Sequence, residues 1–132
     1  MSEPKPILVV DDQPLIRMTI AEVLAEAGYA TLQAKDGPAA IEQIDRGVQL
    51  CALVTDIRLG RGESGWEVAQ YARDKFPALA VVYITADSAG DWSVNGVPLG
   101  VFLQKPFASA QLLITISDLL RPQGQCSGVG LN

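Results

Sequence analysis

The stretch that decides the fold is ILVVDD, from Ile7 to Asp12, in which four apolar residues run directly into two aspartates. Continuous β-branched runs of this length are typical of strands buried on both faces, as in a parallel sheet covered by helices. A weaker run that we also interpret as a strand is Ala30–Gln33. Three further apolar runs predict the remaining strands, at Cys51–Val54, Val81–Ile84 and Val101–Leu103.

Apolar residues at spacings of three and four lie between these runs and predict helices. These helices run from Pro14 to a stop at Gly28, from about Pro38 to a stop at Gly47, over Trp66–Phe76 and over Ser109–Leu120. A further helix belongs in Ser88–Pro98, where two glycines and an asparagine favour a short or irregular one. The alternation of strands and helices predicts an α/β fold with a doubly wound parallel sheet.

The amino-acid composition limits the kinds of active site that this chain can form. Its 132 residues suit one domain, and 48% hydrophobic against 19% charged residues is too apolar for disorder. The absence of histidine excludes a Ser-His-Asp triad, a Cys-His dyad and any site in which this chain ligates a metal through histidine. Two cysteines, Cys51 and Cys126, are too few for a disulfide scaffold or a zinc site, and we expect Cys51 in the core.

The charge balance bears on partners and location. Ten basic against 15 acidic residues give a formal charge of −5, which argues against direct nucleic-acid binding. No apolar run has the length of a membrane span, and the first residues lack the layout of a signal peptide. We therefore expect a cytoplasmic protein with reduced thiols, and no nucleic acid or membrane among its partners.

Polar side chains follow the predicted strands at their carboxyl ends. These are Asp11 and Asp12, Thr55 and Asp56, Thr85 and Ala86, and Gln104 and Lys105. A lone aspartate after a strand is usually a helix cap or turn residue. The carboxyl ends of parallel strands share one edge of the sheet, however, and sites of such folds lie there. We therefore expect three carboxylates, a hydroxyl and an amine together.

Three carboxylates this close repel one another, so either one is protonated or a cation is bound. A hard divalent ion with oxygen ligands fits, namely Mg²⁺ or Mn²⁺. Lys105 indicates where an anion would sit, and an aspartate beside the ion is suited to attack phosphorus and form an aspartyl phosphate. Thr85 is placed to hydrogen-bond a phosphoryl oxygen.

In these residues the chain resembles the receiver domain of two-component response regulators, of the single-domain type found in chemotaxis. The matching positions are Asp11-Asp12, Asp56, Thr85-Ala86 and Lys105-Pro106-Phe107, and the resemblance covers about residues 5–121. It implies a flavodoxin-like (βα)5 three-layer sandwich with five strands in the order 2-1-3-4-5. It also implies a receiver domain over residues 1–121, and we expect residues 122–132 to form a flexible tail.

The resemblance assigns roles to the acidic residues. Asp56 would be the phosphoacceptor, taking its phosphoryl group from a histidine kinase phosphohistidine. Asp12 and Asp56 would hold Mg²⁺ directly, Asp11 would act largely through water, and the backbone carbonyl of Arg58 would complete the protein ligands.

The resemblance also assigns roles around the phosphoryl group. Thr85, the Ala86 amide and Lys105 would bind it, and the bond before Pro106 would be cis. Phe102 would switch together with Thr85 on phosphorylation, although a packed strand residue is the alternative there. The last implied role is tuning of phosphoryl lifetime, by Arg58 and Asp87.

The expected function is a binding module rather than a turnover enzyme. Its partners would be a histidine kinase or a histidine phosphotransfer protein and a downstream protein, with the chain a monomer or weak dimer. The few residues after Leu120 are too short for a DNA-binding domain, so we expect a stand-alone receiver or one excised from a longer protein.

Four alternatives remain open. One is a phosphorelay intermediate that passes phosphate to a histidine phosphotransfer protein. Another is an aspartate-nucleophile phosphatase, although that class has a D-x-D pattern where this chain has adjacent aspartates. A nucleotide-binding domain would need a glycine loop after the first strand, which VVDDQPLIR lacks. The last alternative, a pseudo-receiver, is disfavoured because all five site positions are intact.

Overall fold

The structure, a computed structural model, describes residues 5–47, 49–59, 64–85, 100–104 and 108–120. The strands are β1 (Ile7–Val10), β2 (Thr31–Ala34), β3 (Ala52–Asp56), β4 (Ala80–Thr85) and β5 (Gly100–Gln104). The helices described are α1 (Pro14–Glu26), α2 (Gly37–Asp45), α3 (Gly65–Lys75) and α5 (Ser109–Leu120). The helix expected over Ser88–Pro98 and the tail 122–132 lie outside these residues.

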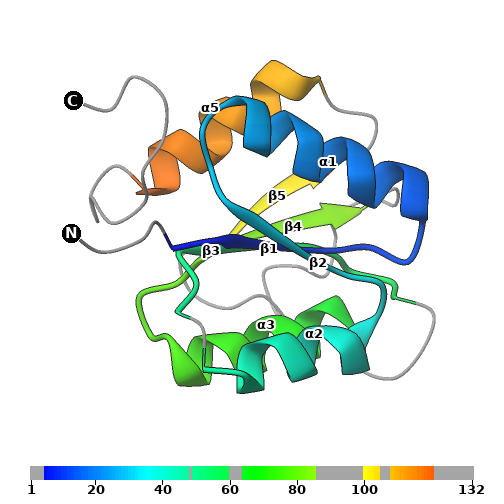
Figure 1. Ribbon diagram of the computed structural model, residues 1–132, viewed down its shortest axis with the longest axis vertical. Helices are drawn as coiled ribbons and strands as arrows, with labels where there is room; N and C mark the ends of the chain where they lie inside the picture. The colour runs from blue at the N-terminus through cyan, green and yellow to red at the C-terminus, as the bar shows by residue number, and fades with distance from the viewer. Residues whose placement is uncertain (1–4, 48, 60–63, 86–99, 105–107, 121–132) are drawn as a thin grey trace.

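The strands form one parallel sheet in the order β2-β1-β3-β4-β5. Helices α1 and α5 cover one face of the sheet, and α2 and α3 cover the other (Figure 1). The predicted α/β class with a parallel sheet is therefore confirmed. Among the described residues, none of the helices combines the length and the apolar character that crossing a bilayer requires.

Strands buried on both faces divide their side chains between two cores. In β1, Ile7 and Val9 pack in the core under α1 and α5, while Leu8 and Val10 pack in the core under α2 and α3. All four side chains are at most 1% exposed. The continuous apolar run, rather than an alternating one, follows from this double coverage.

The predicted strand ends need correction. Strand β2 lies one residue later than predicted, and three strands continue into the polar residues that were expected to follow them. Asp56 pairs with Ile84 in the β3–β4 ladder, and Thr85 pairs with Gln104 in the β4–β5 ladder. Pairing is a property of the backbone, so a ladder continues past the point where side chains turn polar.

Helix ends follow their local sequence. Gly28 and Gly47 have φ of 99° and 86°, the left-handed conformation that a helix stop favours, as predicted. Helix α2 is capped by Asp36, whose carboxylate accepts the Ala39 amide at 2.9 Å. Helix α3 begins with a capping box of Ser64 and Glu67, which the sequence reading overlooked.

Cys51 has one expected and one unexpected property. Its side chain is buried, at 1% exposure, as predicted for a core residue. It is disulfide-bonded, however, so the expectation of a reduced thiol is wrong for this cysteine. That expectation rested on composition and on the character of the first residues, which do not report whether a given thiol is oxidised.

Candidate metal centre

The carboxyl edge of the sheet is set by the register of its central strands. Val10 pairs with Thr55, so Asp11 and Asp56 come next on adjacent strands, β1 and β3. The Asp11 amide donates to the Ala34 carbonyl at 3.2 Å, which ties the end of β1 to β2. The Ile57 amide donates to the Ile84 carbonyl at 3.1 Å and ties the residue after Asp56 to β4. Backbone pairing on both sides thus places the two aspartates at one edge.

Three carboxylates meet at this edge. Asp11, Asp12 and Asp56 each offer one oxygen, and these oxygens all lie within 4.8 Å of one another. Their exposure is graded, because Asp11 is fully buried, Asp56 is 8% exposed and Asp12 lies on the surface. The cluster therefore has a buried floor and an open side through which an ion or a reactant can approach.

Backbone amides orient the two buried carboxylates. The Gln13 amide donates to Oδ1 of Asp11 at 2.9 Å, and the Arg58 amide donates to Oδ1 of Asp56 at 3.2 Å. Each bond spans two residues and forms the short turn that aspartate favours after a strand. The Thr55 hydroxyl donates to the Asp56 carbonyl at 2.9 Å, so the main chain beside Asp56 is held as well.

Gly65 supports Asp56 from the start of α3. Its amide donates to the Ile57 carbonyl at 2.8 Å. A Cβ at this position would lie 2.2 Å from the carbonyl oxygen of Asp56 and 2.7 Å from the Cα of Ile57, so only glycine allows the approach. The sequence reading missed this residue, because its contact is with another element and no local pattern signals it.

The donor set fits a hard divalent cation. Three carboxylate oxygens within 4.8 Å carry like charges that repel unless a cation or a proton offsets them. Oxygen ligands of this kind are those that Mg²⁺ and Mn²⁺ prefer, and Mg²⁺ usually takes one or two carboxylates and keeps several waters. Asp12, which is exposed, and Asp56, which is 8% exposed, are the residues that would hold it, with the fully buried Asp11 next to them.

The structure describes only some of the predicted site residues. It brings Asp11, Asp12 and Asp56 together, and it places Arg58 on the surface with its amide on Asp56. Thr85 is the last residue of β4, and Phe102 lies in β5 opposite Tyr83. The remaining predicted residues lie outside the described part of the chain, namely Ala86, Asp87, Lys105 and Pro106.

Comparisons with known proteins agree with this arrangement. The family described as "Response regulator receiver domain" matches residues 7–117. "Response regulator MprA" of Mycobacterium leprae is 35% identical over 117 residues, which make up 87% of this chain and 50% of that protein. "Alginate biosynthesis transcriptional regulatory protein AlgB" of Pseudomonas aeruginosa is also 35% identical, over 86% of this chain and 25% of its own length. The chain thus spans half or less of these two relatives.

Solved structures show the same fold. A response regulator receiver protein from Sinorhizobium medicae superposes with a TM-score of 0.87 and is 38% identical, covering 90% of this chain and 96% of its own. The response regulator protein TrrA from Thermotoga maritima, solved in complex with Mg(2+)-BeF, has a TM-score of 0.72 and 31% identity. It covers 88% of this chain and 99% of its own.

Proposed function

The chain belongs to the response regulator receiver domain family of two-component systems, whose members are phosphorylated by histidine kinases, and we propose that Asp56 is its phosphoacceptor. The observation that carries the proposal is the meeting of three carboxylates at the carboxyl edge of β1 and β3. Asp56 is the member of this cluster that combines near-complete burial with a place at the end of the central strand.

The proposed reaction is a phosphoryl transfer from a phosphohistidine to a carboxylate. An oxygen of Asp56 attacks phosphorus, an O–P bond forms, and the P–N bond breaks with its electron pair going to the histidine ring nitrogen. The Arg58 amide on Oδ1 and the Thr55 hydroxyl on the Asp56 carbonyl hold the nucleophile in one orientation before transfer.

The reaction needs charge compensation, because an anionic phosphoryl group approaches an acidic cluster. When bound at these carboxylates, Mg²⁺ would supply that positive charge and would polarise the phosphoryl oxygens. Asp12 and Asp56 would hold the ion, Asp11 would act through water, and the Arg58 carbonyl would complete the protein ligands. The Mg(2+)-BeF complex of the similar TrrA protein supports this choice of metal.

The phosphoryl group itself would be bound by residues at the ends of β4 and β5. Thr85 ends β4 beside the strand that carries Asp56, which supports a contact from its hydroxyl. The Ala86 amide and Lys105 would complete this set, with a cis bond before Pro106. Phe102 would move together with Thr85 on phosphorylation, and the resulting change would alter partner binding.

The lifetime of the aspartyl phosphate would depend on two further residues, Arg58 and Asp87. We propose that they pair across the mouth of the site and hinder the attacking water. Replacing Arg58 with alanine should then speed the decay of the phosphorylated protein. An unchanged decay rate would exclude this role for Arg58.

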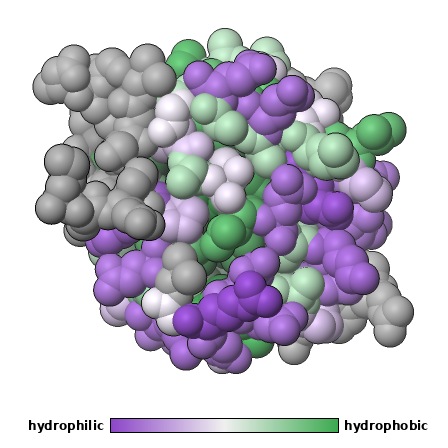
Figure 2. Space-filling model, viewed as in Figure 1, coloured by the Kyte–Doolittle hydropathy of each residue, from purple (hydrophilic) through white to green (hydrophobic). Residues whose placement is uncertain are grey.

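The partner surface is proposed to include α1. Leu15 and Met18 lie one turn apart on this helix and are 81% and 56% exposed, just beyond the acidic pair. By contrast, the α2–α3 side of the molecule is largely hydrophilic in the view of Figure 2. Exposed apolar side chains beside the reactive edge suit a protein that must bring a phosphohistidine to Asp56. A histidine kinase or a histidine phosphotransfer protein would be that partner, in the cytoplasm.

The experiment is phosphorylation by acetyl phosphate with Mg²⁺, followed by intact mass. The wild-type protein should gain one phosphoryl group, and Asp56→Asn should gain none. Asp74→Asn is the matched control, because Asp74 accepts an exposed hydrogen bond from Gln70 on α3 and is not part of the cluster of Asp11, Asp12 and Asp56. Phosphorylation that persists in Asp56→Asn would move the acceptor to another carboxylate, and sustained turnover of a phosphate ester would favour a phosphatase.

A further inference from the structure

Arg17 on α1 is a cation whose side chain contacts the main chain of the acidic edge. Its Nη1 donates to the backbone carbonyl of Asp11 at 3.1 Å. Its Nε donates to the side-chain oxygen of Gln33, on edge strand β2, also at 3.1 Å. Arg17 is half-buried as a residue, and its two hydrogen bonds use two donors of the planar guanidinium, a geometry that arginine alone offers.

These contacts extend a network across three elements. The Gln33 carbonyl in turn accepts a bond from the Gln43 side chain on α2, at 3.5 Å. The Arg17 amide donates to the Gln13 carbonyl at 2.9 Å, within the same turn whose Gln13 amide holds Oδ1 of Asp11. Arg17 thus hydrogen-bonds through Nε to the Gln33 side chain on β2 and through Nη1 to the main chain between β1 and α1.

We infer that Arg17 is a positioning residue for the metal centre, an inference that rests on the proposed function. The carbonyl that Arg17 binds belongs to the peptide joining Asp11 to Asp12, so this hydrogen bond fixes the orientation of that peptide. The carboxylate of Asp12 is exposed, and the main chain beneath it is therefore what restrains its position. Residues that hold metal ligands from behind usually change metal affinity when they are replaced.

The positive charge of Arg17 makes the sign of the effect informative. A cation beside an acidic cluster competes with Mg²⁺, so removing its charge alone would strengthen metal binding. Loss of positioning would weaken it. Arg17→Gln removes both the positive charge and the planar guanidinium donors. Arg17→Lys keeps the charge but lacks the planar pair of donors. Gln33→Met removes the side-chain acceptor on β2 while leaving Arg17 intact.

The test is the dissociation constant of Mg²⁺ from the unphosphorylated protein, measured by isothermal titration calorimetry. Arg17→Gln and Arg17→Lys should each weaken binding by about tenfold, the lower end for residues behind a metal ligand. Gln33→Met should weaken it less, and adding it to Arg17→Gln should have no further effect because the two residues act in one network. Arg46→Gln, the same charge change at the exposed end of α2, is the matched control and should bind as the wild type does.

Unfolding by denaturant without Mg²⁺ separates positioning from a general loss of stability. Variants that remain fully folded at the titration temperature and still bind Mg²⁺ weakly support the inference. Wild-type affinity in Arg17→Lys, or tighter binding in Arg17→Gln, would overturn it. Should an Arg17 variant fail to fold, Gln33→Met, which changes an exposed side chain on the sheet edge, decides between weakened and unchanged affinity. Failure of the wild type itself to bind Mg²⁺ would instead count against the proposed function.

Discussion

At the carboxyl edge of the sheet Asp11, Asp12 and Asp56 bring like charges within 4.8 Å, whereas toward the amino edge Asp45 lies against groups that neutralise it. Oδ1 of Asp45 accepts from the Tyr71 hydroxyl and lies 3.3 Å from the Lys75 ammonium. Both edges thus carry acid, and toward the amino edge the carboxylate of Asp45 is paired with the Lys75 ammonium.

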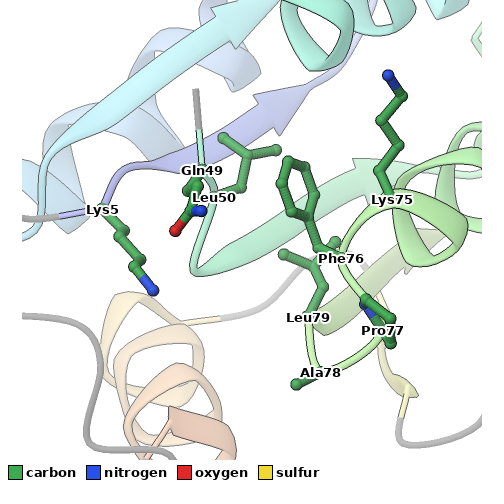
Figure 3. Close-up of a pocket in the computed structure, with 8 residues that line it drawn as sticks. All are labelled: Lys5, Gln49, Leu50, Lys75, Phe76, Pro77, Ala78 and Leu79. Carbon is green, nitrogen blue, oxygen red and sulfur yellow. The ribbon is translucent and has the colours of Figure 1, made fainter. Parts of the chain in front are cut away.

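The amino edge also holds a pocket of about 180 Å³ (Figure 3). Apolar side chains form much of its wall, and no acidic residue is among those that line it. They are Lys5, Gln49, Leu50, Lys75, Phe76, Pro77, Ala78 and Leu79. Lys75 ends α3, where a cation complements the negative end of the helix dipole. The contacts at this edge favour folding, whereas the clustered carboxylates at the other edge repel one another unless a cation or a proton offsets their charge.

Gly65→Ala should have the largest combined effect, because a side chain at this position disturbs the backbone of the acidic edge and so lowers both stability and metal affinity. The added methyl group would meet the Asp56 carbonyl at 2.2 Å, and overpacking of this kind costs about 3 kcal/mol of unfolding free energy. Asp56 would be displaced too, so Mg²⁺ affinity should fall along with stability. Denaturant unfolding and calorimetric titration measure the two effects, and wild-type values in both would show that the close approach is not required.

Leu79→Ala should separate stability from metal binding at the amino edge. Leu79 is 2% exposed in the core under α2 and α3, so its truncation should cost about 2–4 kcal/mol. Mg²⁺ affinity should stay within about twofold of wild type, because distant sites act independently. A large change in affinity would mean that the two edges are coupled through the sheet.

Asp12→Asn should raise stability in metal-free buffer. Removing one of three crowded charges relieves repulsion of about 1 kcal/mol for each neighbouring carboxylate, the Coulomb energy of two unit charges about 4 Å apart in water. At saturating Mg²⁺ the wild type should be the more stable protein, because the variant lacks one metal ligand and gains less stability from metal binding. Thermal unfolding with and without Mg²⁺ gives both comparisons. An equal rise in unfolding temperature on adding Mg²⁺ in the two proteins would show that Asp12 is not a metal ligand.

The smallest effect concerns Asp45 and pH. The Tyr71 hydroxyl, and then Lys75, hold the pKa of Asp45 below its ordinary value of 3.8. A lowered pKa in the folded state favours folding above the unfolded pKa, and this contribution disappears as pH falls through the folded value. The stability difference between wild type and Asp45→Asn should therefore be positive at neutral pH and shrink below about pH 4. Urea unfolding across this range measures it, and a difference independent of pH would exclude the ionic contribution.

Much of the fold follows from local sequence. The apolar run Ile7–Val10 predicted a strand buried on both faces, and Gly28 and Gly47 marked helix stops that the backbone angles confirm. The strand ends were misplaced, because ladders such as Asp56 with Ile84 depend on backbone pairing that hydropathy does not report. Cys51 was placed in the core correctly, but its disulfide was not foreseen, since pairing depends on distance in space.

The sequence by itself determined the types of residue at the acidic edge, because Asp11, Asp12 and Asp56 end apolar runs whose parallel pairing brings them to one side. Only the tertiary structure decided how they are held. The register of β1 on β3 sets their spacing, Gly65 admits the close approach of α3 to Asp56, and Arg17 reaches the main chain of Asp11 from another element. Such contacts join residues of different elements, so their geometry arises only when those elements pack.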